Sequence, residues 1–443
     1  MMLRSLILIL LAVSILSGAR QKITVLHIND THGHLEPFMF NGTNIGGAAR
    51  IASLIKAIRA TNDAPVLLFH TGDTLSRGDA MTLMSGGGAN LAVMEKLGFD
   101  AYIPGNGDFY GGAADVLRFS GLTAIPFLGA NITLRSNGMR LFPPYIITNV
   151  GGVRTALLGL CFIRLEHAGS RELAMQDAVP CAQMLYPELA SNDIIIALTH
   201  IGFDEDRRLA ASVPIRVVIG GHSHTVLSPA FLMPSMSSPS NSTLIAQAGE
   251  HYACLGRVDI LLETGPPAQI ISAAGVLIPV DAGIPEDPEV AATIRSYREK
   301  AGELLAVASA DIPHARSGDS PAGKLAAAAV MKETAVDAAV IDRRSIAAGF
   351  SKGPISYNDV FRMHSGRSAI VICELTGDVL KTIAAGDVYA ALPEYIERTS
   401  SYAVAMTEHL FIKMANDGIP CRAADRRLDI LIADYLRHRR TIE

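Results

Sequence analysis

Five short polar motifs carry residue types suited to metal chemistry, and each directly follows an apolar run. They read N-D-T-H-G-H at 29–34, G-D-T at 72–74, G-N-G-D at 105–108, L-T-H at 198–200 and G-G-H-S-H at 220–224. Their candidate metal ligands are Asp30, His32, Asp73, Asn106, His200, His222 and His224. Carboxylates, imidazoles and one amide oxygen in this proportion suit two divalent metals that share a carboxylate. Such a pair activates water and stabilises both oxygens of an in-line displacement.

One such motif alone is a weak signal, because D-x-H and H-x-H triplets are common in ordinary turns. Five of them in order, each at the end of a predicted strand, are difficult to obtain by chance. Apolar runs predict strands at 23–28, 66–69, 194–198 and 217–219, with a further short strand before Gly105. Helical periodicity covers 48–60 and about 89–97. Strands that alternate with helices indicate a layered α/β domain, whose polar strand ends meet at one edge.

Length, charge and the N-terminal segment restrict the class of protein. The 443 residues suffice for two or three domains, and a net charge of -5 argues against a nucleic-acid polymer as partner. Arg4, the apolar stretch 6–16 and the small residues 17–19 predict a signal peptide at 1–19, with an uncleaved anchor as the alternative. We therefore expect an exported protein, periplasmic or extracellular, with no stable membrane span after cleavage.

The rest of the chain divides at a proline- and acid-rich segment. D-A-G-I-P-E-D-P at 281–288 marks a boundary, and a charged helix at about 289–305 is typical of a connector. We predict a metal domain at 20–285, a linker helix at 286–305 and a smaller domain at 306–443. Other expected elements are a loop at 226–242, strands at 369–373 and 402–405, and helices near 322–333 and 425–439.

The five cysteines contain no C-x-x-C pair, which excludes a zinc ribbon or a redox motif of that type. They are Cys161, Cys181, Cys254, Cys373 and Cys421. At most two disulfides can form, and Cys161 and Cys181 are the closest pair along the chain. Spacing cannot establish disulfide geometry, so we expect mostly buried thiols.

The motif order D-x-H, G-D, G-N, H, G-H-x-H resembles that of the calcineurin-like metallophosphoesterases. I-T-V-L-H-I-N-D-T-H-G-H-L-E-P-F at 23–38 is similar to the opening of the exported 5′-nucleotidase branch of that family. Residues 131–160 and 353–383 also resemble this branch, and L-D-I-L-I-A-D-Y-L at 428–436 resembles its closing helix. The resemblance implies a four-layer α/β/β/α sandwich, joined by a helical linker to a smaller α/β substrate domain.

The resemblance also implies how the ligands divide between two metals. Metal one would take Asp30, His32, Asp73 and His224. Metal two would take Asp73, Asn106, His200 and His222, so that Asp73 bridges. The same ligands accept zinc, manganese, iron or cobalt, so the identity of the metals stays open.

The third motif departs from the family. It usually reads G-N-H-E-F-D, whereas residues 105–110 read G-N-G-D-F-Y. Gly107 has no side-chain donor, and the loss of one positioned donor or acid costs about two to four decades in rate. Asp108 retains a carboxylate in a supporting position. Arg77 and Tyr110 are candidates to act in place of the missing histidine, although Arg77 equally fits a surface arginine and Tyr110 a wall residue.

The C-terminal region departs as well. The phosphate-binding N-G-G-G-I-R of this branch corresponds to I-D-R-R-S-I-A at 341–347, which leaves Arg343 and Arg344 as candidate anion ligands. The P-F-G-N segment, whose Phe stacks on the base, corresponds to H-S-G-R at 364–367, where Ser365 cannot stack and Arg367 is a candidate to pair with an anion. Phe411 is a loose candidate for the second aromatic position.

These observations favour an exported dinuclear-metal phosphoesterase. Its expected substrate is a nucleotide or another small anionic phosphate ester, attacked by hydroxide on the metals. One alternative is a thiosulfohydrolase-like enzyme of sulfur oxidation, which shares the architecture and varies the same histidine. Another is a catalytically weak, metal-containing binding protein. The sequence leaves the oligomeric state open.

Overall fold

The N-terminal domain of the protein is built on two sheets. The structure, a computed structural model, describes residues 19–75, 78–234, 242–265, 268–364, 368–414 and 419–443. The first sheet contains, in spatial order, β15 (Gln269–Pro279), β14 (Cys254–Glu263), β1 (Arg20–Ile28), β4 (Val66–His70) and β5 (Ala101–Tyr102). The second contains β12 (Phe231–Met233), β13 (Thr243–Ala246), β11 (Val217–Ile219), β10 (Ile194–His200), β8 (Val153–Cys161) and β7 (Tyr145–Val150).

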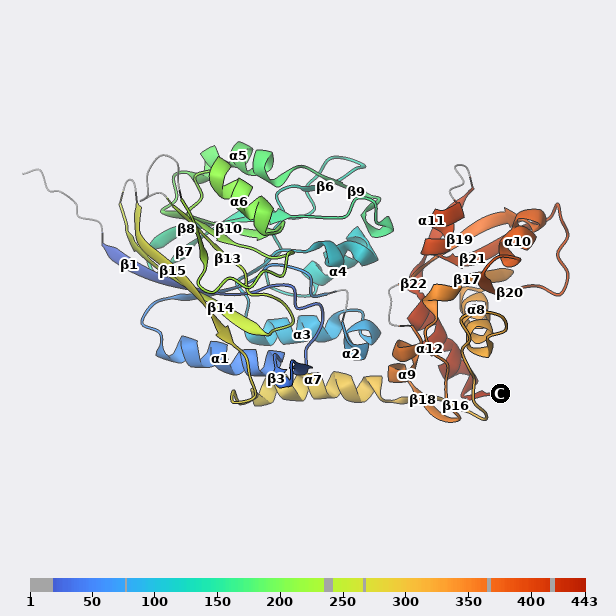
Figure 1. The fold of residues 1–443 in the computed structure, drawn as a ribbon. Helices are drawn as coiled ribbons and strands as arrows, with labels where there is room; N and C mark the ends of the chain where they lie inside the picture. Colours follow the sequence, from blue (N-terminus) through green and yellow to red (C-terminus); the bar gives the residue numbers. More distant parts are fainter. Residues whose placement is uncertain (1–18, 76–77, 235–241, 266–267, 365–367, 415–418) are drawn as a thin grey trace, which may run out of the picture.

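Helices cover the outer faces of both sheets (Figure 1). Helices α1 (Ala48–Thr61) and α3 (Gly88–Leu97) lie on one side of the domain, and α5 (Ala178–Leu189) and α6 (Phe203–Ser212) lie on the other. Helix α1 turns its buried residues Ile51 and Ile55, one turn apart, toward the core. The four layers confirm the predicted α/β/β/α sandwich.

The central strands of both sheets are parallel and buried. β1 pairs in parallel with β4, and β4 with β5, while β8, β10, β11 and β13 form a second parallel run. Every residue of β10 is buried, which explains its continuous aliphatic sequence: both faces of such a strand are covered. Because parallel strands point the same way, their C-terminal ends gather at one edge of each sheet.

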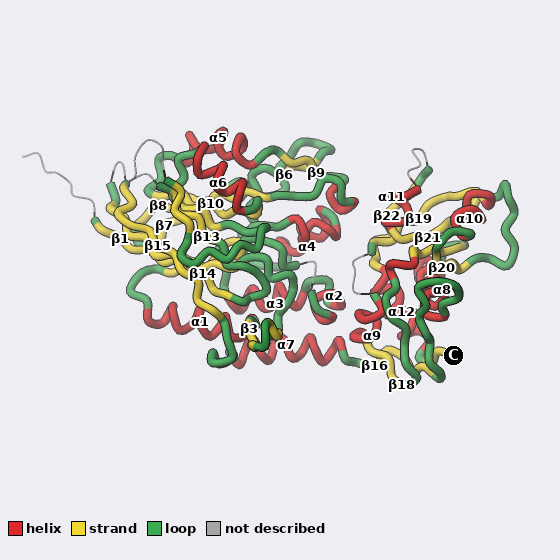
Figure 2. The backbone as a smooth tube through the Cα atoms, in the orientation of Figure 1, coloured by secondary structure: helices red, strands yellow, loops and turns green. Residues whose placement is uncertain are grey.

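Shorter elements connect these strands (Figure 2). They are β2 (Phe38–Phe40), β3 (Thr43–Ile45), α2 (Ala80–Met84), η1 (Asn106–Gly111), α4 (Ala113–Gly121), β6 (Ile132–Leu134), η2 (Ala168–Ser170) and β9 (Leu173–Met175). β12 falls inside the predicted loop 226–242, because residues 231–233 pair with β13. The remainder of that loop, 235–241, lies outside the described residues.

Helix α7 (Pro288–Ala301) connects the two domains. The side chain of Asp287 accepts hydrogen bonds from the backbone N–H groups of Glu289 and Val290, and Pro288 occupies the first turn, where no N–H is needed. The helix packs on α1, α2 and α3. Its predicted end near 305 is wrong, because the chain leaves the helix at Gly302 and Leu304–Ala308 forms strand β16.

The C-terminal domain has two further sheets. One orders β18 (Gly353–Ser356), β16 and β23 (Thr441–Ile442). The other orders β20 (Val388–Ala391), β17 (Ala338–Asp342), β21 (Ser401–Thr407), β19 (Ala369–Thr376) and β22 (Cys421–Arg427). Its helical elements are α8 (Pro321–Thr334), η4 (Arg343–Ser345), α9 (Tyr357–Met363), α10 (Gly377–Ala384), α11 (Glu408–Met414) and α12 (Leu428–Arg439).

The predicted helix at 425–439 starts three residues too early. Residues 425–427 belong to β22, which pairs antiparallel with β19, so strand pairing takes residues that local periodicity assigned to the helix. The last residue of that strand, Arg427, donates from Nη2 to the backbone oxygen of Leu83 at 2.5 Å. This hydrogen bond joins the C-terminal domain to α2 of the N-terminal domain.

The predicted signal segment lies almost entirely outside the described residues, which begin at 19. Within the described part of the chain, no helix combines the length and the apolar character needed to cross a bilayer.

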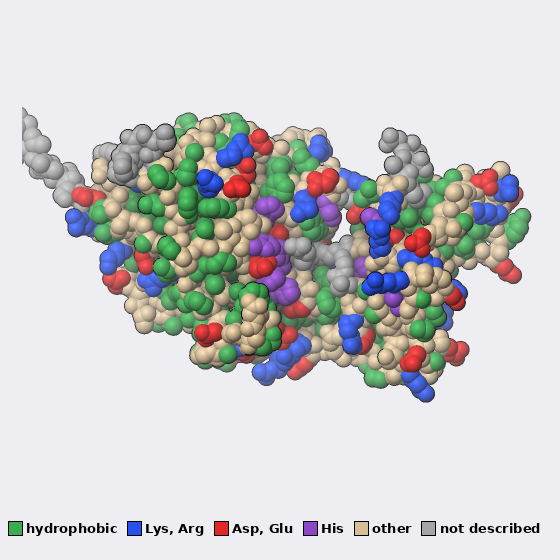
Figure 3. Space-filling model, viewed as in Figure 1, with side chains coloured by type: hydrophobic (Ala, Val, Ile, Leu, Met, Phe, Trp, Pro, Cys, Tyr) green, Lys and Arg blue, Asp and Glu red, His purple; other side chains and the backbone are tan. Residues whose placement is uncertain are grey.

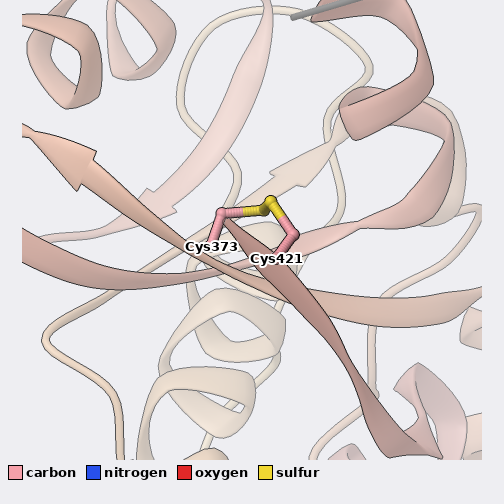
Figure 4. The surroundings of a disulfide bond; sticks show 2 residues. All are labelled: Cys373 and Cys421. Atoms are coloured by element: carbon pink, nitrogen blue, oxygen red, sulfur yellow. A yellow bond between two sulfur atoms is a disulfide. The ribbon is translucent and has the colours of Figure 1, made fainter. Parts of the chain in front are cut away.

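A disulfide between Cys373 and Cys421 links two neighbouring strands (Figure 4). The two residues are directly opposed in the antiparallel pair of β19 and β22. The expectation of mostly buried thiols holds for Cys161 and Cys181, which stay unpaired and buried. It missed the disulfide because 48 residues separate the two cysteines, and only strand pairing brings them together.

We predict that removing this disulfide destabilises the C-terminal domain. A cross-link that closes a loop of this length is worth roughly 2 to 4 kcal/mol, largely by restricting the unfolded chain. The double variant Cys373→Ala with Cys421→Ala is expected to unfold at lower urea concentration, as followed by circular dichroism and by hydrogen exchange of the β19 and β22 peptides. Cys254→Ala, at a half-buried free thiol, serves as control. An unchanged transition on reduction of the wild type would contradict the prediction.

Candidate metal centre

The seven candidate ligands meet where the parallel strands of the two sheets end. Asp30 follows β1, Asp73 follows β4, and Asn106 opens η1 shortly after β5. His200 ends β10, and the histidines at 222 and 224 follow β11. Figure 3 shows histidine side chains gathered on the half of the N-terminal domain that is nearer the C-terminal domain. The predicted convergence of the polar strand ends is thus present in the fold.

Five of these residues form two overlapping groups. Ligand atoms of Asp30, His32 and His224 lie within 4.8 Å of one another, as do those of Asp30, Asp73 and His200. Nε2 of His224 lies 3.3 Å from Oδ1 of Asp30, and Nε2 of His200 lies 3.5 Å from Oδ1 of Asp73. Asp30 belongs to both groups, whereas Asp73, the predicted bridge, belongs to one of them. The carboxylate of Asp73 also lies 3.8 Å from Nδ1 of His32, a member of the other group.

The backbone at the site is held in an unfavourable conformation. The left-handed region is adopted by Asp30 (φ 50°), His32 (φ 47°), Asp73 (φ 58°), His222 (φ 78°) and His224 (φ 54°). Non-glycine residues rarely adopt it, and such strain gathers at functional sites. Hydrogen bonds between motifs maintain it: the N–H of Asp30 donates to the oxygen of Gly72 at 2.9 Å, and that of His32 to the oxygen of Asp73 at 2.7 Å.

Two histidines are oriented by acceptors that face their Nδ1 atoms, the ring nitrogens on the side away from the aspartates. Nδ1 of His200 lies 2.7 Å from the backbone oxygen of Thr71, which can only accept, so Nδ1 carries the proton. Nδ1 of His224 lies 2.7 Å from a carboxylate oxygen of Glu250. In both rings this leaves Nε2 to face the aspartates, the arrangement that supporting residues impose on metal-binding histidines.

Glu250 was not among the residues predicted from the sequence. It has the same sequence pattern as the other motifs, a polar motif after an apolar strand: G-E-H at 249–251 follows β13. His34, two residues beyond His32, packs its ring on His251 with centroids 4.1 Å apart, so these histidines border the site.

Burial and mutual proximity perturb the pKa values of the ligands. Burial alone would raise the pKa of Asp30, but the imidazoles of His200 and His224 and the amide of Asn29 hold it well below its usual range. The pKa of Asp73 is raised, mainly by burial, with repulsion from Asp108 and Asp30 adding to the shift. Burial lowers the pKa of His222 to about 4, which keeps this imidazole neutral and able to bind a cation.

Buried atoms that lack partners show that these residues fit a metal centre. Oδ1 of Asp30, Oδ1 of Asn106 and Nε2 of His200 are buried and have no hydrogen-bond partner among the described residues. Such atoms are costly unless another ligand satisfies them. Nε2 of His32 and Nε2 of His224 lie only 3.0 Å apart, a spacing at which a shared cation is a natural partner. Oxygen and imidazole donors together suit zinc, manganese, iron or cobalt.

Asp108 supports the loop that carries Asp73. Its carboxylate accepts backbone N–H groups of Asp73 (3.0 Å), Thr74 (3.0 Å), Leu75 (2.8 Å) and Gly105 (2.8 Å), and the hydroxyl of Tyr102 (2.5 Å). With both oxygens so engaged, the structure favours a positioning role over direct contact with a substrate.

Tyr110 lies beside the candidate ligand Asn106. Its hydroxyl accepts a hydrogen bond from Nδ2 of Asn106 at 3.0 Å, which fixes the amide and leaves Oδ1 for a cation. The other candidate for replacing the missing histidine, Arg77, lies outside the described residues, and so does Arg367, the predicted anion ligand of the C-terminal domain.

The C-terminal candidates are engaged elsewhere. Arg343 pairs with Asp387 at 2.8 Å, donates to the backbone of Gly318, and lies over the ring of Tyr389. Arg344 is exposed. The ring of Phe411 lies 5.6 Å from the guanidinium of Arg171, which belongs to the N-terminal domain. In the described part of the chain, neither Arg343 nor Phe411 contacts a candidate metal ligand.

Comparison with known proteins places both domains. A profile of the calcineurin-like phosphoesterases matches residues 23–226, and a profile of the 5′-nucleotidase C-terminal domain matches residues 299–391. The first match contains all seven candidate ligands. The second matches much of the C-terminal domain.

Individual relatives align over most of the chain. The trifunctional nucleotide phosphoesterase YfkN of Bacillus subtilis is 28% identical over 81% of this chain, which spans 27% of that longer protein. A 5′-nucleotidase of Vibrio vulnificus is 26% identical, covering 82% of this chain and 76% of its own length. A 5′-nucleotidase precursor from Thermus thermophilus shares the fold, with a TM-score of 0.62, 22% identity, and 95% and 97% of the two chains covered.

We predict that the protein binds two divalent metals per chain and that Asp73→Asn is the most damaging single change. Because Asp73 is expected to bridge the two metals, one substitution weakens the binding of both. Elemental analysis after gentle purification is expected to show near two equivalents for the wild type and fewer than one for the variant. Asp204→Asn, on the exposed face of α6, is the control. Less than one equivalent in the wild type, even after supply of manganese or zinc, would refute the assignment.

We also predict that Asp108→Asn destabilises the metal-free protein by about 1 to 3 kcal/mol, because the amide group turns a donor toward backbone donors. Tyr102→Phe removes one of the five donors and is expected to cost about 1 kcal/mol. Chelator-treated protein unfolded in urea provides the measurement without a contribution from metal binding. Equal stability of Asp108→Asn and the wild type would show that the carboxylate does not hold this loop.

Proposed function

The chain belongs to the 5′-nucleotidase family, with a calcineurin-like phosphoesterase domain followed by a 5′-nucleotidase C-terminal domain, and on this premise we propose that it is an exported hydrolase of nucleotides or related small phosphate esters. The observation that carries the proposal is the convergence of Asp30, Asp73 and His200 with buried, unpartnered ligand atoms. Family membership makes the protein a metallophosphoesterase, while the substrate and the export belong to the proposal.

The residues of the site divide into those that hold metals and those that orient them. Two divalent metals, when bound, supply an activated water molecule and positive charge at the phosphoryl oxygens. The seven candidate ligands hold them, with Asp73 as the predicted bridge. Thr71 and Glu250 orient two of the imidazoles. Asp108 fixes the loop that presents Asp73, and Tyr110 fixes the amide of Asn106.

The third motif limits how much the protein itself adds to this chemistry. A Cβ atom at Gly107 would lie 3.1 Å from both carboxylate oxygens of Asp73, so this position directly borders the predicted bridge. The family places an imidazole donor there, and this chain places none. Turnover through this site therefore depends on the metals and on donors from other parts of the chain.

The C-terminal domain supports weak recognition of the base. Ala347 stands where the family has a phosphate-binding arginine, and it is exposed. Phe411, the candidate aromatic clamp, lies beside Arg171 rather than on an open face. Base stacking is worth about 1 to 3 kcal/mol per base, so its loss reduces discrimination between bases by roughly one to two decades.

Two observations support export. Residues 1–19 have the charge, apolar stretch and small residues of a signal peptide. The disulfide between Cys373 and Cys421 suits an oxidising compartment, such as the periplasm or the extracellular space.

We predict hydrolysis of small phosphomonoesters with weak preference among bases. Catalytic efficiencies on AMP, UMP, glycerol phosphate and a bis-aryl phosphodiester, measured with metal-reconstituted protein, are expected to place AMP and UMP within about a hundredfold of each other. Asp73→Asn is the matched control and is expected to remove hydrolysis of every substrate. A larger preference for AMP would reveal an aromatic clamp.

The same assay separates the alternatives. A protein that binds two metals but hydrolyses none of these esters would be the metal-containing binding protein. Release of sulfate from an S-sulfonated cysteine peptide, without phosphatase activity, would identify the thiosulfohydrolase-like enzyme.

A further inference from the structure

A segment from the other sheet passes beside the third motif. After β8 ends at Cys161, the ring of Phe162 packs on His222 with centroids 4.8 Å apart. Five residues later, the ring of His167 stacks on Tyr110, with centroids 4.3 Å apart and planes inclined by 25°. The segment therefore runs from His222 to Tyr110, the tyrosine that holds Asn106. His222 and Asn106 are both predicted ligands of metal two.

The turn that carries His167 is closely docked on the third motif. A Cβ atom at Gly169 would lie 2.2 Å from the backbone oxygen of Phe109 and 2.8 Å from that of Tyr110. Only glycine permits this approach, so the packing of η2 on η1 fixes the position of His167 relative to the motif.

Hydrogen bonding determines which nitrogen of His167 can donate. The backbone N–H of Gly169 donates to Nδ1 of His167 at 3.1 Å. A backbone N–H can only donate, so Nδ1 is an acceptor and Nε2 carries the proton of the neutral ring. The side chain is only partly buried, which leaves it accessible to a ligand.

We propose that His167 donates a hydrogen bond from Nε2 to a phosphoryl oxygen of the bound ester, in place of the imidazole that the family has at position 107. The proposal rests on the proposed function. Its basis is a rigid connection: the stacked ring of Tyr110 positions His167, while the hydroxyl of the same tyrosine holds Asn106 at 3.0 Å. His167, which follows strand β8 of the second sheet, thus supplies the hydrogen-bond donor that Gly107 lacks.

Two substitutions at one position test this role. We expect His167→Ala to lower kcat for p-nitrophenyl phosphate by about a hundredfold, the effect of removing one positioned donor. We expect the affinity of the metal-loaded protein for inorganic phosphate, measured by calorimetry, to fall about tenfold. His167→Gln, which keeps an amide donor, is expected to recover part of both losses. His438→Gln, on the exposed surface of α12, is the control and is expected to leave kcat and the affinity for phosphate unchanged.

Metal content and melting temperature separate this role from a structural one. If His167→Ala retains two metals and the wild-type melting temperature but binds phosphate as tightly and turns over as fast as the wild type, the proposal is overturned. Parallel loss of metal in both variants would likewise overturn it, because the histidine would then act on the fold. A wild type that binds phosphate through His167 without hydrolysing esters would refute the proposed function alone. A wild type that neither binds phosphate nor hydrolyses esters would refute both.

Discussion

Asp30 and Asp73 place two carboxylates in the interior of the N-terminal domain, and the structure around them serves to make that charge tolerable. Buried charges are costly unless they are paired or coordinate a metal. His200 lies between both carboxylates, His32 and His224 flank Asp30, and backbone amides reach the remaining oxygens. Oδ1 of Asp30 still lacks a hydrogen-bond partner among the described residues, as do Oδ1 of Asn106 and Nε2 of His200. A site with these properties is stable as a cation-binding centre and poorly satisfied as a polar core.

The same requirement explains why the ligands lie on strained turns. A side chain at the end of a buried parallel strand reaches the sheet edge only if the chain turns sharply, and five candidate ligands adopt left-handed backbone conformations to do so. The second motif is packed so closely that a Cβ atom at Gly72 would lie 2.4 Å from Nδ1 of His200. Two covered sheets, with their hydrogen-bonded strand ends, supply the rigidity that keeps such turns in place.

Divergence is concentrated where the substrate, rather than the metal, is contacted. All seven predicted ligands match the motifs of the family. The third motif has lost an imidazole, and the C-terminal domain has lost an aromatic clamp. In their place the structure brings His167 against Tyr110, and Arg171 against Phe411. Both new neighbours come from residues 162–171, so one segment lies between the metal centre and the C-terminal domain. One fold can carry different specificities through changes at its site, and these departures lie at positions predicted to contact the substrate.

The sequence by itself determined the parallel strands that precede the motifs, the order of the motifs and the candidate ligands. Each of these is local, because an apolar run followed by a polar turn lies within about ten residues. It did not reveal Glu250 beside His224, the disulfide between β19 and β22, or the start of α12 at Leu428. Nor did it reveal that His167 lies on Tyr110. Each of these depends on pairing or packing between segments distant in the chain. Such contacts form only when the sheets fold against one another, since hydrophobic patterning specifies which face is buried but not which distant residue it meets.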